Sequence, residues 1–261
     1  KIEIEVEKVI SNMKIIGLVN VQLAYVNNNV FILEVNPRAS RTIPFVSKAL
    51  GIPLARVAAK VMAGKSLKDL KFQNVPNLEG FFVKEAVMPF NKFQNVDPIL
   101  GPEMRSTGEV MGIGNSFAEA FEKAEVGAGV EIPKEGSVFI SVRDTDKQFL
   151  SEIVPSLVEE DFKLIATKGT ASVIKNMGFK VSQIKKVIEG RPNIVDLMKN
   201  KEVNLVINTT EGRESILDSA SIRRTALDEK ICCTTTIKGA KAICEVITKK
   251  VDWSYRKLQD I

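Results

Sequence analysis

The chain of 261 residues is long enough for two hydrophobic cores, and its 37 Lys and Arg against 32 Asp and Glu give a net charge of +5. This mild basic excess, without an arginine-rich run and with 6% aromatic residues, argues against a nucleic-acid-binding protein. Three cysteines, two of them adjacent, match neither a metal-binding spacing nor a disulfide framework, and no stretch is typical of a signal peptide or a membrane span. We therefore expect a cytoplasmic protein with reduced thiols and no membrane partner. Because the sequence starts at Lys1 without Met, we also expect a fragment of a longer protein.

The first half of the chain predicts a helix, a hairpin and two further helices. The helices are expected at about 3–13, 45–50 and 54–63, and the strands at 18–26 and 30–35. Three successive asparagines, Asn27 to Asn29, favour a turn between the strands. Residues 64–116 are rich in Gly, Pro, Asn and Phe and predict one clear strand, 81–88. Ser116 is a good N-cap for a helix over 117–124.

Residues 127–133, Gly-Ala-Gly-Val-Glu-Ile-Pro, are the best linker candidate in the chain. After them, strands and helices alternate regularly. The strands are expected at 137–142, 163–166, 181–185, 205–208 and 231–234, and the helices at 146–159, 171–177, 194–200, 213–228 and 237–248. Alternation with short loops predicts an α/β domain, a doubly wound parallel sheet with helices on both faces. We therefore expect two domains, residues 1–126 and 134–261.

Polar side chains gather where the second predicted strand ends. Glu34 and Asn36 are two residues apart, so on a strand they point to the same side. Gln22 belongs to the preceding strand, and Arg38 comes just after the strand end. Carboxylate and amide oxygens suit Mg²⁺ held against a polyphosphate, and an arginine can neutralise phosphate oxygens. For a Glu-x-Asn pattern alone, a solvated strand end is the alternative.

The longer string around this pattern, Glu34-Val-Asn-Pro-Arg-Ala-Ser-Arg41, resembles the ATP-grasp signature of the carbamoyl phosphate synthetase large subunit. The resemblance continues in the same order through strings that begin at Thr42, Val61, Val83, Asp97, Thr167, Glu189 and Ile207. It covers essentially the whole chain and matches the C-terminal quarter of that subunit. It implies that residues 1–126 are the C-terminal part of an α+β ATP-grasp domain.

The same resemblance implies an activity for the complete protein: ATP-dependent phosphorylation of carbamate to carbamoyl phosphate, for pyrimidine and arginine biosynthesis. Gln22, Glu34 and Asn36 would hold Mg²⁺ or Mn²⁺, with K⁺ as a further ion. Arg38 and Arg41 would be catalytic, although a structural ion network is the alternative for Arg41. The implied partners are a glutaminase small subunit and the remainder of the large subunit, in an oligomer. Because the upstream lysines and lid are missing, we expect the chain alone to be inactive; an effector-binding and assembly module without catalysis is the alternative function.

A second group of polar residues follows the strands of the predicted parallel sheet, where ligands bind beyond the carboxyl ends. One loop opens a helix and consists of Thr167, Lys168, Gly169 and Thr170. The other candidates at this edge are Lys147, Lys186, Asn208, Thr209 and Thr210. Hydroxyls, a glycine for close approach and a helix N-terminus suit an anion, so their convergence predicts a phosphate pocket. The alternative is helix capping by the threonines and solvated lysines.

This half resembles the methylglyoxal synthase-like domain, which is allosteric in that large subunit and binds nucleoside monophosphates in bacterial relatives. Freestanding methylglyoxal synthases use a histidine and a Gly-Gly-Asp-Gln-Gln string, and this chain has neither, so we expect no catalysis here. Glu85 matches an ornithine contact of the family. However, Thr234 stands where ornithine-responsive relatives carry an acidic residue, so nucleotide control is better supported than ornithine control.

Overall fold

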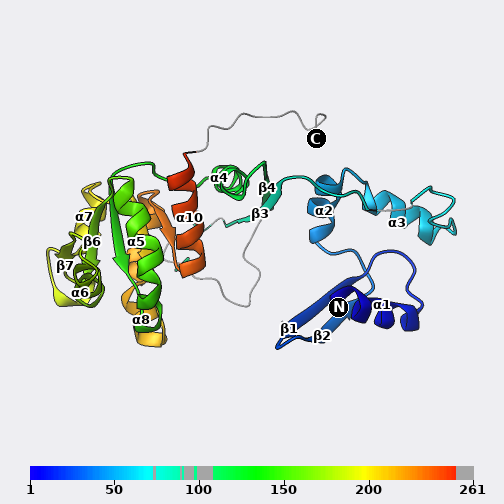
Figure 1. The fold of residues 1–261 in the computed structure, drawn as a ribbon, viewed down its shortest axis with the longest axis horizontal. Helices are drawn as coiled ribbons and strands as arrows, with labels where there is room; N and C mark the ends of the chain where they lie inside the picture. The colour runs from blue at the N-terminus through cyan, green and yellow to red at the C-terminus, as the bar shows by residue number, and fades with distance from the viewer. Residues whose placement is uncertain (73–74, 89, 91–96, 99–107, 251–261) are drawn as a thin grey trace. The chain divides into compact units, whose positions relative to one another are not determined.

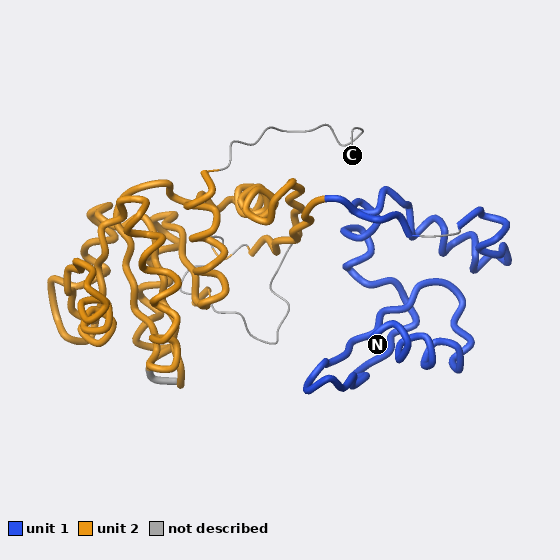
Figure 2. The backbone as a smooth tube through the Cα atoms, viewed as in Figure 1, with its two compact units in different colours: residues 1–79, 256–261 blue, residues 80–255 orange. Residues whose placement is uncertain are grey.

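The computed structural model describes residues 1–72, 75–88, 90, 97–98 and 108–250 (Figure 1). The chain divides into two compact units, with residues 1–79 in unit 1 and residues 80–255 in unit 2 (Figure 2). In the part of the chain that the structure describes, no helix has the length and apolarity needed to cross a bilayer.

Unit 1 contains a hairpin and three helices. Its elements are α1 (Ile2–Met13), β1 (Asn20–Val26), β2 (Asn29–Asn36), α2 (Thr42–Leu50) and α3 (Leu54–Met62). The predicted asparagine turn is confirmed, because Asn27 and Asn28 both take positive φ values, 49° and 62°, which this residue type tolerates in hairpin turns. Gln22 pairs with Glu34, but Leu23 pairs with Ile32. A bulge at Leu33 therefore interrupts the ladder.

Unit 1 has almost no core of its own. Among its described residues only Ala58 is buried, whereas Phe31 and Leu33 on β2 are 52% and 67% exposed. Apolar side chains on a strand normally pack against another layer. The hairpin therefore carries apolar side chains that nothing within the described part of unit 1 covers, as expected of part of a domain.

Unit 2 begins with an antiparallel pair, β3 (Phe81–Val87) and β4 (Gly108–Gly114), on which α4 (Phe117–Ala128) packs. The predicted cap is confirmed, since the Ser116 hydroxyl accepts a hydrogen bond from Glu119 N–H. Strand β4 was not predicted. A Cβ atom added at Gly112 would lie 1.8 Å from the Ala120 carbonyl oxygen, so this strand needs glycine to let α4 approach. Glycine is a poor strand signal.

The end of α4 differs from the expected linker. The helix continues past Ala124 through Gly127 to Ala128, and Ala118 joins the same core as Ile132. Residues on both sides of 127–133 thus belong to unit 2, and the compact units divide at Gly80. The assignment of residues 1–126 and 134–261 to two domains stays a prediction.

The rest of unit 2 is a five-stranded sheet in the order β7-β6-β5-β8-β9, with every neighbouring pair parallel. Its strands are β5 (Ser137–Ser141), β6 (Lys163–Thr167), β7 (Ser182–Ile184), β8 (Leu205–Asn208) and β9 (Cys232–Thr234). Its helical segments are η2 (Asp144–Phe149), α5 (Leu150–Glu159), α6 (Lys168–Asn176), η3 (Val187–Glu189), α7 (Ile194–Lys199), α8 (Arg213–Asp218), α9 (Ala220–Asp228) and α10 (Ile237–Lys249). The predicted doubly wound sheet is therefore confirmed, strand by strand.

Two of the predicted helices are broken. The helix expected at 146–159 begins as the 3₁₀ turn η2 and becomes α-helical at Leu150. The helix expected at 213–228 is interrupted at Ser219. Near this break the Arg223 guanidinium donates to the Ile216 carbonyl oxygen at 2.6 Å, so a side chain supplies a partner for a carbonyl of the last turn of α8.

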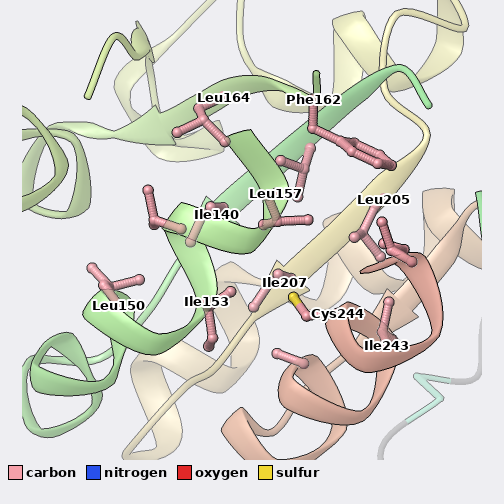
Figure 3. Close-up of a cluster of buried hydrophobic side chains, with 14 of the residues drawn as sticks. Ile140, Leu150, Ile153, Leu157, Phe162, Leu164, Leu205, Ile207, Ile243 and Cys244 are labelled. Atoms are coloured by element: carbon pink, nitrogen blue, oxygen red, sulfur yellow. The ribbon is translucent and has the colours of Figure 1, made fainter. Parts of the chain in front are cut away.

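The core of unit 2 lies on both faces of this sheet. Successive side chains of β5 alternate between two clusters, because Val138 and Ile140 join one and Phe139 joins the other. The first cluster contains side chains of α5 and α10, including Ile153 and Cys244 (Figure 3). The second contains residues of α7 and α9. Helices thus cover both faces, as the alternating pattern predicted.

Truncation of this core is expected to be costly. Ile153→Ala removes a fully buried side chain and should lower the free energy of unfolding of unit 2 by about 2–5 kcal/mol. Leu33→Ala is the control, because that side chain is 67% exposed in unit 1 and its loss should cost less than about 0.5 kcal/mol. Urea unfolding followed by circular dichroism measures both. Equal losses would contradict this placement of the core.

Candidate functional site

A polar pocket of about 510 Å³ lies at the carboxyl ends of β5, β6 and β8. Strands β6 and β7 lie on one side of β5 in the sheet, and β8 and β9 lie on the other side. The β5–β8 border is therefore the switch point, which is where doubly wound sheets bind ligands. The predicted residues that line this pocket are Lys147, Thr167, Gly169, Thr170, Lys186, Asn208, Thr209 and Thr210.

Lys168 is the one predicted contact that the structure places elsewhere. It does not line the pocket, and its side chain is exposed at the start of α6. Its neighbours on both sides, Thr167 and Gly169, do line the pocket. The structure thus does not bring the Lys168 side chain to the pocket, because sequence adjacency within a turn does not ensure a common side-chain direction.

The two threonines of the loop are buried and do not cap α6. Thr167 occupies the N-cap position, but its hydroxyl makes no capping bond and lies 3.1 Å from the Ser141 hydroxyl at the end of β5. Thr170 accepts a hydrogen bond from Val142 N–H at 3.2 Å. Both hydroxyls therefore tie the β6 loop to β5, and the capping alternative is wrong.

Asn208 is the clearest sign of an unfilled hydrogen-bonding requirement in the pocket. It ends β8 and is 2% exposed, and its Nδ2 is buried without an acceptor among the described residues. A buried donor without a partner costs about 1–3 kcal/mol, and native proteins rarely leave one unpaired. An anionic oxygen in the pocket is a partner of the right chemistry for this amide.

Lys147 supplies positive charge at the wall of the pocket. Its Nζ lies 2.7 Å from Asp144 Oδ1 in the same turn of η2. A Cβ added at Gly169 would lie 3.2 Å from this Nζ, so the ammonium rests against the glycine backbone. The hydrogen bond from Lys147 holds the pKa of Asp144 below its usual range, and the Lys186 charge contributes in the same direction. Both predicted lysines thus contribute positive charge close to the Asp144 carboxylate.

Several residues that line the pocket were not predicted from the sequence. Arg143 follows β5, its Nε donates to Asp146 Oδ2 at 2.8 Å, and its Nη1 lies 3.9 Å from Glu211. Ser141 and Arg143 share the strand-end signal that singled out Lys147 and could have been found the same way. Four further missed residues come from the segment that follows β8: Ser215, Asp218, Ser219 and Ile222. No sequence signal marks these.

A second cavity of about 820 Å³ includes residues just before β8 and β9, such as Asn204 and Ile231. Its lining mixes both charges, and Lys134 there pairs with Glu122. It contains no predicted site residue and, within the described ranges, no buried polar atom without a partner. This cavity therefore shows fewer signs of a ligand site than the pocket at the carboxyl ends of β5, β6 and β8, which we call the strand-end pocket.

In unit 1 the hairpin brings the predicted metal ligands together. Gln22 and Glu34 are directly paired across β1 and β2, and Asn36 lies two residues further along β2. The prediction that these three side chains share a face is confirmed. Asn36 Nδ2 is buried without an acceptor among the described residues, so this amide has a hydrogen-bonding requirement that the hairpin does not satisfy.

The side chains of Gln22, Glu34 and Asn36 suit a hard cation that also binds oxygens from outside the hairpin. Glu34 is the single carboxylate among them, and the amides of Gln22 and Asn36 add oxygens. Within the described residues no group of three or more His, Cys, Asp and Glu gathers as a metal site. Arg38 and Arg41 are exposed after β2 and form no ion pair with any described residue. Phosphate oxygens and waters would complete such a coordination shell.

Glu85, the predicted ornithine contact, lies on β3 and not in the strand-end pocket. Burial raises its pKa. Burial, followed by the charge of Glu85, raises the pKa of Glu125 on α4 to about 7. The carboxyl groups of Glu85 and Glu125 thus repel one another when both are charged. The ornithine contact stays a prediction.

Comparison with known proteins matches both halves of the chain. Residues 1–70 match the family model "Carbamoyl-phosphate synthase L chain, ATP binding domain", and residues 150–235 match "MGS-like domain". Curated carbamoyl phosphate synthase large chains from Pseudomonas aeruginosa and Pseudomonas putida are 55% and 54% identical over 98% and 100% of this chain. That from Halomonas eurihalina is 50% identical over 98%. The chain spans 24% of the length of each of these relatives.

A solved structure, a methylglyoxal synthase from Elizabethkingia anophelis NUHP1, also matches. It has a TM-score of 0.37 at 16% identity and covers 43% of this chain and 79% of that chain. A likeness at this level carries no argument about the present chain.

Proposed function

The chain belongs to the family of carbamoyl phosphate synthase large chains, and on that premise we propose that its residues serve an ATP-dependent ligase with a nucleotide-controlled domain. In the proposed reaction an oxygen of carbamate attacks the γ-phosphorus of ATP, ADP leaves, and carbamoyl phosphate forms. Glutamine, hydrolysed by a small subunit, supplies the ammonia. We place the complete enzyme in the cytoplasm, in pyrimidine and arginine biosynthesis.

The hairpin of unit 1 is the proposed metal–phosphate contact of that enzyme. Mg²⁺ or Mn²⁺ bound by Gln22, Glu34 and Asn36 would neutralise charge on the phosphates of ATP. Arg38 follows the strand end and would donate to oxygens of the transferring phosphoryl group. Arg41, at the start of α2, would add a second positive charge. The match of residues 1–70 to an ATP-binding domain supports these roles.

The strand-end pocket of unit 2 is the proposed effector site, and it takes a nucleoside monophosphate such as uridine or inosine monophosphate. One observation carries this proposal: eight of the nine residues expected from the sequence line one pocket. In that pocket the buried Nδ2 of Asn208 has no hydrogen-bond acceptor among the described residues. A phosphate would meet the ammonium groups of Lys147 and Lys186 and the N–H groups that open α6. The pocket volume, about 510 Å³, suits a small ligand.

Removing a pocket lysine is expected to weaken nucleotide binding strongly. Lys186→Ala in the 261-residue chain should lower the affinity for uridine monophosphate about tenfold to a hundredfold, because a charge-assisted hydrogen bond contributes about 1.5–3 kcal/mol. Calorimetry measures both proteins. Lys168→Ala is the control, since it removes the same charge from the same region but outside the pocket, and it should stay within about twofold of the unchanged chain.

Two results would contradict the effector site. One is undetectable binding of every nucleoside monophosphate at millimolar concentration. The other is an equal loss of affinity in Lys186→Ala and Lys168→Ala, which would mean that general charge attraction, and not the pocket, holds the ligand.

A second candidate function is an effector-binding and assembly module without catalysis of its own. The observation that favours it is the contrast between the units, because Ala58 is the single buried residue among those described in unit 1. On either view the 261-residue chain alone should not form ATP from carbamoyl phosphate and ADP. The full-length protein separates the two functions, since only the ligase would do so.

A further inference from the structure

We propose that Asp144 is a built-in counter-ion of the pocket, which holds Lys147 in the free chain and gives it up to the phosphate of the ligand. The inference rests on the proposed binding of a nucleoside monophosphate at this site. It makes binding an exchange of anions, in which a dianionic phosphate replaces a carboxylate of the protein itself.

The geometry around Lys147 suits such an exchange. Asp144 Oδ1 lies 2.7 Å from Lys147 Nζ, and the Asp144 side chain is 93% exposed whereas that of Lys147 is 26% exposed. The lysine is held at the pocket wall against Gly169, and the carboxylate reaches it from the solvent. Asp144 can therefore leave into water at little cost in desolvation, while the ammonium stays in place.

The neighbouring cation has the same kind of partner. Arg143 Nη1 faces Glu211 at 3.9 Å, and the Glu211 side chain is 62% exposed. By contrast, Asp146 accepts from Arg143 Nε and has an 8% exposed side chain. The buried carboxylate fixes the arginine side chain, and the exposed one lies where a ligand anion could take its place. Two rim cations thus each face a solvent-exposed, exchangeable carboxylate.

The exchange determines which ligands the pocket accepts. An exposed ion pair between single charges contributes little to stability, so a phosphate with two charges and additional hydrogen bonds to the loop N–H groups can replace it. A nucleoside without phosphate brings no charge to compete with Asp144. We therefore expect uridine monophosphate to bind and uridine not to bind.

Removing the internal competitor should improve binding. Asp144→Asn in the 261-residue chain is expected to raise the affinity for uridine monophosphate about twofold to fivefold in calorimetry. The control is Asp228→Asn, which removes the same charge from an exposed ion pair with Arg224 that does not line the pocket. Its affinity should equal that of the unchanged chain.

Each outcome of this titration is decisive. Unchanged or weaker binding by Asp144→Asn, with normal binding by the unchanged chain, overturns the exchange and leaves Asp144 as a residue that positions Lys147 for the ligand. Equal gains in Asp144→Asn and Asp228→Asn also overturn it, because net charge alone would then explain them. If no form of the chain binds uridine monophosphate at millimolar concentration, the proposed effector site itself is wrong.

A second measurement follows Asp144 directly. In the free chain the pKa of this carboxyl lies below its usual range because of Lys147, which carbon-detected NMR titration of the side chain can measure. Saturation with uridine monophosphate should raise this pKa, because Lys147 turns to the phosphate and the phosphate repels the carboxylate. A pKa of Asp144 that is the same with and without the nucleotide would overturn the proposal.

Discussion

Glu34→Ala, made in the full-length protein, is expected to lower carbamoyl phosphate formation by roughly 10²–10³-fold or more. The reason is the charge of the three proposed metal ligands on the hairpin. Gln22 and Asn36 are neutral, so Glu34 supplies the single negative charge that this face of the hairpin offers to a cation. Without it, the proposed ion would be held less tightly and the charge on the ATP phosphates would be compensated less well.

The assay is the formation of ATP from ADP and carbamoyl phosphate, with Mg²⁺ or Mn²⁺ varied over a wide range. Glu34→Gln should be nearly as impaired as Glu34→Ala, because it keeps the shape and loses the charge. Glu7→Ala is the control, since Glu7 is an exposed carboxylate on α1 of the same unit, and it should keep full activity. Wild-type turnover by Glu34→Ala would refute the metal role.

The second large effect concerns the stability of unit 2. Arg223 is 2% exposed, and it forms a two-point contact with Asp97, with Nε to Oδ1 at 2.8 Å and Nη2 to Oδ2 at 2.5 Å. Asp97→Asn would leave the buried guanidinium without its counter-charge. Breaking such a pair by removing one partner is expected to cost about 3 kcal/mol of unfolding free energy.

Urea unfolding of the 261-residue chain measures this loss. Asp228→Asn breaks an exposed pair with Arg224 and should cost less than about 1 kcal/mol. Replacing both partners of the buried pair, with Arg223→Met and Asp97→Leu, should restore part of the stability lost in Asp97→Asn, because no unpaired charge remains buried. A loss in Asp97→Asn no larger than in Asp228→Asn would contradict the buried-pair account.

The sheet of unit 2 could be predicted from the sequence because local pattern and tertiary fold agree there. The run Leu205–Asn208, which is apolar up to its last residue, is buried throughout, which is the pattern of a parallel strand. Strand β4 could not be predicted in this way, since Gly112 is required by the close approach of α4 and weakens the strand signal. The break at Ser219 depends on where the Arg223 side chain reaches, which no local pattern encodes.

The pocket shows the same division between local and long-range information. Its strand-end residues were predictable, because the carboxyl ends of parallel strands meet at one edge. The position of Lys168 outside the pocket depends on side-chain direction, and the contribution of Ser219 depends on the packing of α9. Both are set by the whole fold. The pairing of Asp144 with Lys147 is local by contrast, because the two residues are three apart in one turn.

The central claim, a nucleotide phosphate at the carboxyl edge of the sheet, is tested most directly by amide NMR of the 261-residue chain during titration with uridine monophosphate. The account predicts saturable shifts of the amides of Thr167 to Thr170 and of the side-chain Nδ2 of Asn208, with little change around Asn204 and Ile231 in the second cavity. Shifts confined to that second cavity, or no shifts up to millimolar nucleotide, would contradict it.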